Sequence, residues 1–289
     1  MGRRFRHAAL VGKHQAEGIR PLLEDIATFL VQQGLQVSFE RQTAHSTHVD
    51  AYGALSPAEI GERCDLAIVV GGDGTMLGIA RELARYDVPL VGINQGRLGF
   101  ITDVPVGQMQ EALEPLIAGD FEEEHRAMLA SEVWRDGGCI FEGLSMNDVV
   151  VSRGATAGMV ELRVDIGEEF VANLRADGLI IASPTGSTAY NLSAGGPILQ
   201  PQLPVMVISP ICPHTLSLRP IVVPDSSRLE IRLDTPREKV FLTLDGQEGA
   251  SLADGDVVRV TKGDATARLV RIGNRSFFDN LRGKLHWGE

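Results

Sequence analysis

The stretch of this sequence best suited to chemistry is a glycine-rich turn that holds one carboxylate, Gly71-Gly72-Asp73-Gly74-Thr75. Glycine has no Cβ, so a phosphate group can approach the backbone amides of such a turn closely. A carboxylate does not suit passive anion binding, but Asp73 could activate a hydroxyl or hold Mg²⁺ beside a transferring phosphoryl group. The turn therefore predicts a phosphate loop formed by its glycines and threonine, with Asp73 as the reactive group.

From these residues alone, a purely structural interpretation of the turn is equally open. Asp73 could simply cap the helix that follows a tight strand-to-helix turn. The Gly-x-Gly-x-x-Gly pattern of Rossmann folds and the Gly-x-x-x-x-Gly-Lys-Ser/Thr pattern of P-loops are both absent from the sequence. The common nucleotide-binding motifs are thereby excluded.

A second candidate stretch, residues 177–197, is rich in small hydroxyl side chains and glycines. Ser187 or Thr188 is expected to cap a short helix over residues 189–194, and Tyr190 offers a ring on which a base could stack. On composition alone, a capped structural turn is as good an explanation as a binding site.

These stretches must be positioned by the elements around them, and strands and helices alternate through the first 125 residues. The glycine-rich turn follows an apolar run of the kind typical of buried parallel strands. Parallel sheets bind ligands beyond the carboxyl ends of their strands, where the loop at residues 94–100 also lies. The sequence predicts strands at residues 7–11, 35–39, 65–70 and 88–93, and helices at residues 19–33, 57–63, 75–85 and 106–117.

Two histidines, His45 and His48, raise the question of a metal site. No third ligand lies nearby, so a polar loop is the better interpretation of this segment. The helix at residues 57–63 is more strongly indicated, because Ser56 and Glu59 form a capping box around a proline at the first helical position.

The second half of the chain is strand-rich. Residues 160–166, 229–233 and 240–244 alternate strictly between apolar and polar side chains, which is typical of antiparallel strands with one solvated face. The predicted fold is an α/β domain with a parallel sheet over residues 1–125, followed by an all-β, sandwich-like domain over residues 126–272. The tail, residues 273–289, has helical spacing and is expected to return to pack on the first domain.

Composition limits the possible partners. A formal net charge of −11 over 289 residues argues against binding to nucleic acid or to an anionic membrane. The three cysteines show no Cys-x-x-Cys spacing, which fits a reducing cytoplasm rather than a disulfide framework or a zinc site. No signal peptide or membrane span is evident.

The glycine-rich turn, the pair Asn147-Asp148 and the segment 177–197 together resemble the NAD kinase family along nearly the whole chain. The turn alone is shared with diacylglycerol and sphingosine kinases and, more loosely, with phosphofructokinases. The resemblance implies that ATP, with Mg²⁺ or Mn²⁺, phosphorylates the 2′-hydroxyl of the adenosine ribose of NAD to give NADP. It also implies a homodimer or homotetramer.

The resemblance further assigns roles to individual residues. Asp73 matches the base proposed to activate the 2′-hydroxyl, and Gly74 beside it matches a dinucleotide contact. Asn147 and Asp148 match the Asn-Glu pair that binds the adenine ribose and base, although Asp148 is one methylene shorter than the usual glutamate.

The remaining matches concern the dinucleotide. Arg175 and Asp177 match a basic and an acidic position on the nicotinamide side. Gln247 matches a late polar contact. The family more often has serine at the position of Asn191. The residues that match the dinucleotide-binding turn are Thr188, Ala189, Tyr190, Asn191, Leu192 and Ser193.

Two alternatives remain open on the sequence. A lipid kinase would share the glycine-rich turn, but the negative net charge and the lack of a basic amphipathic helix argue against it. A non-catalytic dinucleotide sensor would keep the cleft, and the intact Asp73 argues against it.

Overall fold

The computed structural model describes residues 5–13, 18–96, 99–102, 104–154, 158–234, 239–273 and 275–288. Two residues of the expected second loop, 97 and 98, and residues 274 and 289 of the tail lie outside these ranges. The chain divides into two compact units: unit 1 comprises Met1–His125 and Thr266–Glu289, and unit 2 comprises Arg126–Ala265.

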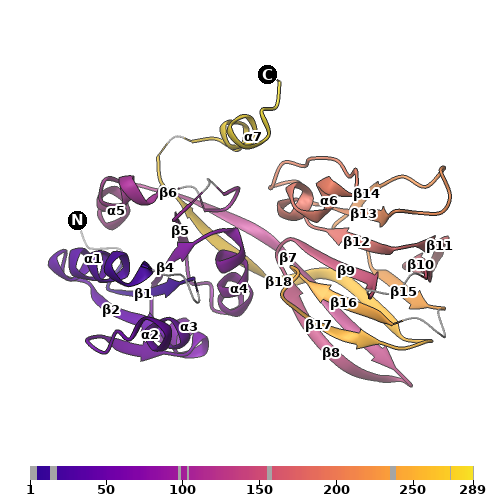
Figure 1. Ribbon diagram of the computed structural model, residues 1–289, viewed down its shortest axis with the longest axis horizontal. Helices are drawn as coiled ribbons and strands as arrows, with labels where there is room; N and C mark the ends of the chain where they lie inside the picture. Colours follow the sequence, from indigo (N-terminus) through magenta and orange to yellow (C-terminus); the bar gives the residue numbers. More distant parts are fainter. Residues whose placement is uncertain are drawn as a thin grey trace. The chain divides into compact units, whose positions relative to one another are not determined.

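Unit 1 is built on a parallel sheet in which the strands follow the order β3-β2-β1-β4-β5 (Figure 1). Strand β6 pairs with the end of β5, and β18 pairs with its beginning, where Leu269 lies beside Leu90. The strands of this sheet are β1 (His7–Gly12), β2 (Gln36–Glu40), β3 (Gly53–Leu55), β4 (Leu66–Gly71), β5 (Leu90–Asn94), β6 (Val104–Pro105) and the end of β18 (Val257–Arg271).

Helices alternate with these strands along the chain. Strand β4 is buried along its whole length, as the apolar run in the sequence predicts, and side chains from α1 and α5 share one apolar core with Leu10, Ile68 and Ile93. The helices of unit 1 are α1 (Ile19–Gln32), α2 (Arg41–Thr47), α3 (Pro57–Arg63), α4 (Asp73–Leu83), α5 (Met109–Ala118) and α7 (Phe277–Leu285), with short 3₁₀ turns at Ala84–Tyr86 and Val106–Gln108.

The expected capping box at α3 is confirmed, since Ser56 and Glu59 exchange both hydrogen bonds. The prediction of a polar loop around His45 and His48 is wrong. That segment forms α2, because the Glu40 carboxylate caps its first turn and accepts the amides of Gln42 and Thr43.

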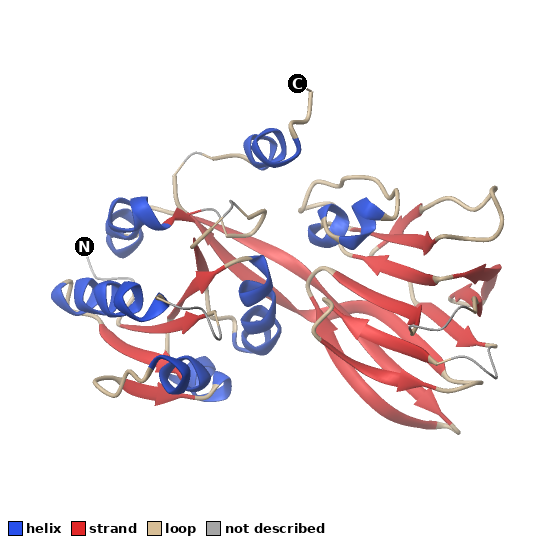
Figure 2. Cartoon of the chain, viewed as in Figure 1, coloured by secondary structure: helices blue, strands red, loops and turns tan. Residues whose placement is uncertain are grey.

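Unit 2 is a β-sandwich, in agreement with the alternating pattern of the sequence, and strands dominate it (Figure 2). One antiparallel sheet has the order β14-β13-β12-β9-β16-β17, and the other contains β11, β10, β15 and β18 with β7 and β8. Side chains from both sheets form one apolar core. The strands that complete the chain are β7 (Glu122–Arg135), β8 (Gly138–Ser145), β9 (Asp148–Arg153), β10 (Val160–Ile166), β11 (Glu169–Ala176), β12 (Gly178–Ala182), β13 (Val205–Ile211), β14 (Ile221–Pro224), β15 (Leu229–Leu233), β16 (Val240–Leu244) and β17 (Glu248–Leu252).

The outer face of β9, β12 and β13 carries the segment that follows β12. This segment forms a 3₁₀ turn, Thr185–Thr188, and a short helix, α6 (Tyr190–Ser193). The expected cap by Ser187 or Thr188 is wrong, because their hydroxyls donate to the carbonyls of Pro184 and Thr185 instead. In the described ranges no helix is both long and apolar enough to cross a membrane.

Candidate active site

Asp73 is the first residue of α4, at the carboxyl end of β4, and its carboxylate is held by a neighbouring loop. Oδ2 accepts the amide of Phe100 at 2.9 Å. Oδ1 accepts the amides of Ile101 and Thr102 at 3.3 and 3.1 Å and the Thr102 hydroxyl at 2.9 Å. The side chain makes no capping bond to α4, so it does not act as the helix cap that the sequence left open. Instead, it is fixed in place by residues that follow β5.

Three glycines shape the space around Asp73 and the glycine-rich turn in different ways. A Cβ on Gly99 would overlap Asp73 Oδ1, so the loop can wrap the carboxylate only because this residue is glycine. A Cβ on Gly71 would come within 2.6 Å of the Thr75 hydroxyl. Next to Gly72, by contrast, a Cβ would meet nothing within 4 Å. The turn therefore has open space on the side of Gly72 where a phosphate could approach.

One cation near Asp73 was not identified by the sequence analysis. The Lys284 ammonium, on α7, lies 3.8 Å from Asp73 Oδ2 and 4.5 Å from the centre of the Phe100 ring. Both charged side chains are 27% exposed. Only helical spacing in the tail pointed to α7, and nothing in that spacing indicates which distant residue Lys284 meets.

The described residues contain no group of three or more His, Cys, Asp or Glu side chains that could hold a metal ion. Mg²⁺ is usually bound by one or two carboxylates together with substrate phosphates and water. The single carboxylate of Asp73 beside an open glycine turn fits such a shared arrangement, whereas a metal cage made wholly of protein ligands does not fit.

In unit 2, the Asn147-Asp148 pair lies against two other predicted segments. The Asp245 carboxylate, in the turn that contains Gln247, accepts the amides of Asn147 and Asp148 at 2.7 and 3.1 Å. The Asn147 carbonyl accepts the Ser183 amide, and a Cβ on Gly186 would overlap that carbonyl. The structure therefore brings together the pair, the late turn and the start of the dinucleotide-binding segment.

The two side chains of the pair have different surroundings. The Oδ1 atom of Asn147 is buried and has no hydrogen-bond partner, which is unusual for a buried acceptor. Asp148 is only 5% exposed. Burial, and secondly the negative charge of Asp245, raises the pKa of Asp148 to about 7.

The dinucleotide-binding segment itself is only partly accessible. Tyr190 is 46% exposed, and Ser193 is also exposed. Asn191 is fully buried: its amide donates to the carbonyls of Ser187 and Pro197, and its oxygen accepts the Ser209 hydroxyl at 2.6 Å. The hydrogen-bonding capacity of the Asn191 amide is therefore used within the protein, and it fixes the turn around its neighbours.

Arg175 and Asp177 lie at the other end of β12. Arg175 pairs with Glu161 at 3.0 Å, and both side chains are more than half exposed. Asp177 pairs with Arg153 at 2.8 Å. The five residues of β12 lie between Asp177 and Ser183, which are therefore about 20 Å apart along an extended chain. The predicted dinucleotide contacts in unit 2 therefore form two groups rather than one.

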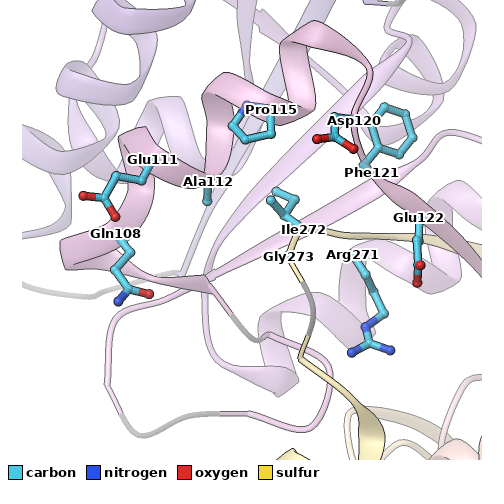
Figure 3. Close-up of a pocket in the computed structure, with 10 residues that line it drawn as sticks. All are labelled: Gln108, Glu111, Ala112, Pro115, Asp120, Phe121, Glu122, Arg271, Ile272 and Gly273. Atoms are coloured by element: carbon cyan, nitrogen blue, oxygen red, sulfur yellow. The ribbon is translucent and has the colours of Figure 1, made fainter.

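A separate pocket of about 390 Å³ lies in unit 1 beside α5 (Figure 3). No residue of the glycine-rich turn lines it. Its charged lining comprises Glu111, Asp120, Glu122 and Arg271, an excess of negative charge that would repel a triphosphate. The pocket is therefore not a candidate for the phosphate site.

Comparison with known protein families gives two matches that together cover most of the chain. Residues 9–121 match the family described as the ATP-NAD kinase N-terminal domain. Residues 146–272 match the family described as the ATP-NAD kinase C-terminal domain.

Curated relatives match over the full length. The chain is 56% identical over 293 residues to a protein named NAD kinase from Methylibium petroleiphilum, with 100% of this chain and 97% of that protein covered. It is 54% identical over 301 residues to a protein of the same name from Variovorax paradoxus, with 100% and 99% covered.

Solved structures share the fold. The structure of yeast NADH kinase complexed with NADH superposes with a TM-score of 0.89 at 26% identity, covering 98% of this chain and 88% of that one. The structure of an NAD kinase from Archaeoglobus fulgidus in complex with ATP gives a TM-score of 0.77 at 26% identity, covering 97% and 98%.

Proposed function

This chain belongs to the family of ATP-dependent NAD kinases, which make NADP from NAD, and we propose that Asp73 is the base of this reaction. The observation that carries this assignment is the way the Asp73 carboxylate is held. Loop residues 100–102 donate four hydrogen bonds to it, while the adjoining glycine turn leaves open space beside Gly72. A base fixed next to a phosphate loop is what phosphoryl transfer to an unactivated hydroxyl requires.

The proposed step moves one proton and one phosphoryl group. Asp73 accepts the proton of the adenosine 2′-hydroxyl as the hydroxyl oxygen bonds to the γ-phosphorus of ATP. The bond between that phosphorus and the β,γ-bridging oxygen breaks, so that ADP leaves and NADP forms. The backbone of residues 71–75 would stabilise charge on the phosphoryl oxygens, and Asp73 would return its proton to water.

A divalent cation, Mg²⁺ or Mn²⁺, is part of this proposal. It would be held mainly by the phosphates of ATP, with Asp73 as its nearest carboxylate, and it would neutralise phosphate charge.

For the dinucleotide, we assign the adenosine half to the group around Asn147. The unpartnered Oδ1 atom of Asn147 supports this assignment, because the side chain would gain a hydrogen bond by turning this buried acceptor toward a donor such as the amino group of adenine. Gln247 and the accessible residues of the turn, including Tyr190, would surround the base and ribose. Asn191 would act indirectly, by holding that turn in shape.

Arg175 and Asp177 would bind the nicotinamide half. Their place at the far end of β12 from Asn147 is compatible with an extended ligand. On binding, each would exchange its present partner, Glu161 or Arg153, for the dinucleotide.

We also propose that the protein works in the cytoplasm as a homodimer or homotetramer. All three cysteines are free thiols, which suits a reducing compartment. Apolar side chains of β11 and β14, among them Val171 and Ile221, are exposed and line a pocket of about 250 Å³. Exposed apolar groups gathered in this way are typical of an interface.

A coupled assay tests the reaction directly. Purified protein with ATP, Mg²⁺ and NAD should form NADP, detected by an NADP-specific dehydrogenase, and should not phosphorylate diacylglycerol. Tight NAD binding without NADP formation would contradict catalysis and favour a dinucleotide sensor.

A further inference from the structure

Helix α7 presents a cation to the carboxylate that we propose as the base. Ser276 and Asp279 form a capping box that defines the start of this helix, and Leu281 is buried at 4% exposure. Asn280 is equally buried. Lys284 lies one turn further on, on the same helix face as these two residues. The buried face of α7 therefore holds the Lys284 stem in a defined direction.

The Lys284 ammonium has donors to spare. Its distance of 3.8 Å from Asp73 Oδ2 is longer than the 2.7–2.9 Å of a charged hydrogen bond. Among the residues that the structure describes, the Lys284 ammonium lies near the Asp73 carboxylate and over the Phe100 ring. None of these residues accepts a hydrogen bond from the ammonium. The Asp73 oxygens already accept four donors from loop residues 100–102. The ammonium is thus placed beside the carboxylate without being neutralised by hydrogen bonds.

Distance also brings Lys284 within range of the reacting group. A hydroxyl oxygen stands one hydrogen bond from its base and one near-attack distance from phosphorus, so the γ-phosphorus would lie within about 6 Å of the accepting oxygen. A cation 3.8 Å from that same carboxylate can reach the phosphoryl oxygens with a small side-chain movement. Phosphoryl transfer places charge on those oxygens and is helped by cations that contact them.

We propose that Lys284 is a catalytic residue that binds the γ-phosphoryl group of ATP during transfer. The proposal rests on the proposed function, since it requires Asp73 to face the reacting hydroxyl. When ATP enters, the ammonium exchanges its contact with Asp73, 3.8 Å away, for the γ-phosphoryl oxygens.

The test compares ATP with ADP, because only ATP carries the phosphoryl group that Lys284 would touch. Lys284→Met keeps an unbranched aliphatic side chain at this position and removes the charge that lies over the Phe100 ring. We expect it to weaken ATP binding about ten- to a hundredfold while ADP binding changes little, and to lower kcat by at least a similar factor. Lys284→Arg should restore part of both losses.

The matched control is Arg282→Met on the same helix. Arg282 is 55% exposed and pairs with Asp279 rather than with the site, so its loss should leave the ATP-to-ADP affinity ratio unchanged. Melting temperatures of all variants would show whether α7 stays docked.

Equal weakening of ATP and ADP in Lys284→Met would overturn the proposal in favour of a structural role. Unchanged ATP affinity, or faster turnover, would also overturn it. The affinity ratio is measured without NAD and needs no NADP formation, so failure here is distinguishable from failure of the proposed function.

Discussion

At the scale of the residue, two carboxylates of the proposed site differ in exposure and in hydrogen bonding. Asp73 is 27% exposed and receives four hydrogen bonds from one loop, whereas Asp148 is buried next to another carboxylate. Burial disfavours the charged form of a carboxylate, which is why the pKa of Asp148 is raised. The same side-chain type is thus partly accessible and held by hydrogen bonds at one position, and enclosed at the other.

Asp73→Asn should separate chemistry from folding. Asparagine keeps one acceptor oxygen but presents an amino group to one of the loop amides, so we expect a stability loss of about 1–2 kcal/mol. Turnover should fall by at least about 10²-fold, because the base is lost, while NAD affinity changes far less. Steady-state kinetics and thermal melting would measure both.

A titration of the metal refines this result. Recovery of turnover by Asp73→Asn at high Mg²⁺ or Mn²⁺ would indicate that the variant had lost coordination of the metal ion, and it would argue against the role of Asp73 as a base. Near-normal turnover with only a lowered Tm would make Asp73 structural.

Asp148 predicts a pH dependence of stability. Its folded-state pKa of about 7 lies above the ordinary value of 3.8, so the folded protein retains a proton that the unfolded chain loses. The resulting stability is fully present below about pH 4 and is lost as the pH rises to 7. Asp148→Asn removes this dependence. Its Tm relative to wild type should therefore rise between pH 5 and 8, and a constant difference would contradict the assigned cause.

At the scale of the element, the loop after β5 and the turn after β4 form one unit. Gly99→Ala places a methyl group onto Asp73 Oδ1 and should cost about 1–3 kcal/mol as the loop shifts. Denaturant unfolding would measure this cost, and the displaced carboxylate should lower kcat as well.

Gly72→Ala is the matched comparison. Its methyl group would enter open space, and its backbone φ of −104° suits alanine, so stability should be preserved. The same methyl group would occupy the side from which a phosphate approaches, so the KM for ATP should rise. An unchanged KM would place the phosphate elsewhere.

Local signals explain which elements the sequence predicts. Helix α3 is predicted because its capping box lies within four residues, and β4 because its apolar run is continuous. Helix α2 is missed because its cap is Glu40, at the end of a strand, and few of its residues are apolar. The prediction that Ser187 or Thr188 caps a helix is wrong because both residues lie in a 3₁₀ turn. Their hydroxyls donate to carbonyls within that turn.

At the scale of the whole molecule, the apolar surface of unit 2 is the feature that predicts assembly. Ile221→Glu places a charge where we expect a partner subunit, and it should shift the oligomer toward smaller species in size-exclusion chromatography with light scattering. Ile140→Glu is the control: Ile140 is 48% exposed on β8 and lies outside the pocket that Ile221 lines. Equal effects of both changes would argue against this surface as the interface.

Contacts between distant residues mark the limit of prediction from the sequence. The family resemblance predicts roles for Asp73, Asn147 and the residues around Tyr190 because their motifs are continuous in the chain. The contact between Lys284 and Asp73 joins residues from the two separate segments of unit 1, and no local pattern encodes it. The same holds for the burial of Asp148, which depends on packing and on the turn at Asp245.

The division of unit 1 into two segments has a consequence for how the chain is made. Residues 1–125 are synthesised before the second segment of unit 1. Leu90 of β5 can therefore pair with Leu269, and Asp73 can contact Lys284, only after that second segment has been made. Contacts between residues that are so far apart in the sequence form late, and they lower the rate of folding. The edge of the first sheet therefore stays open while unit 2 is synthesised, and the surroundings of Asp73 are completed only when the last helix has emerged.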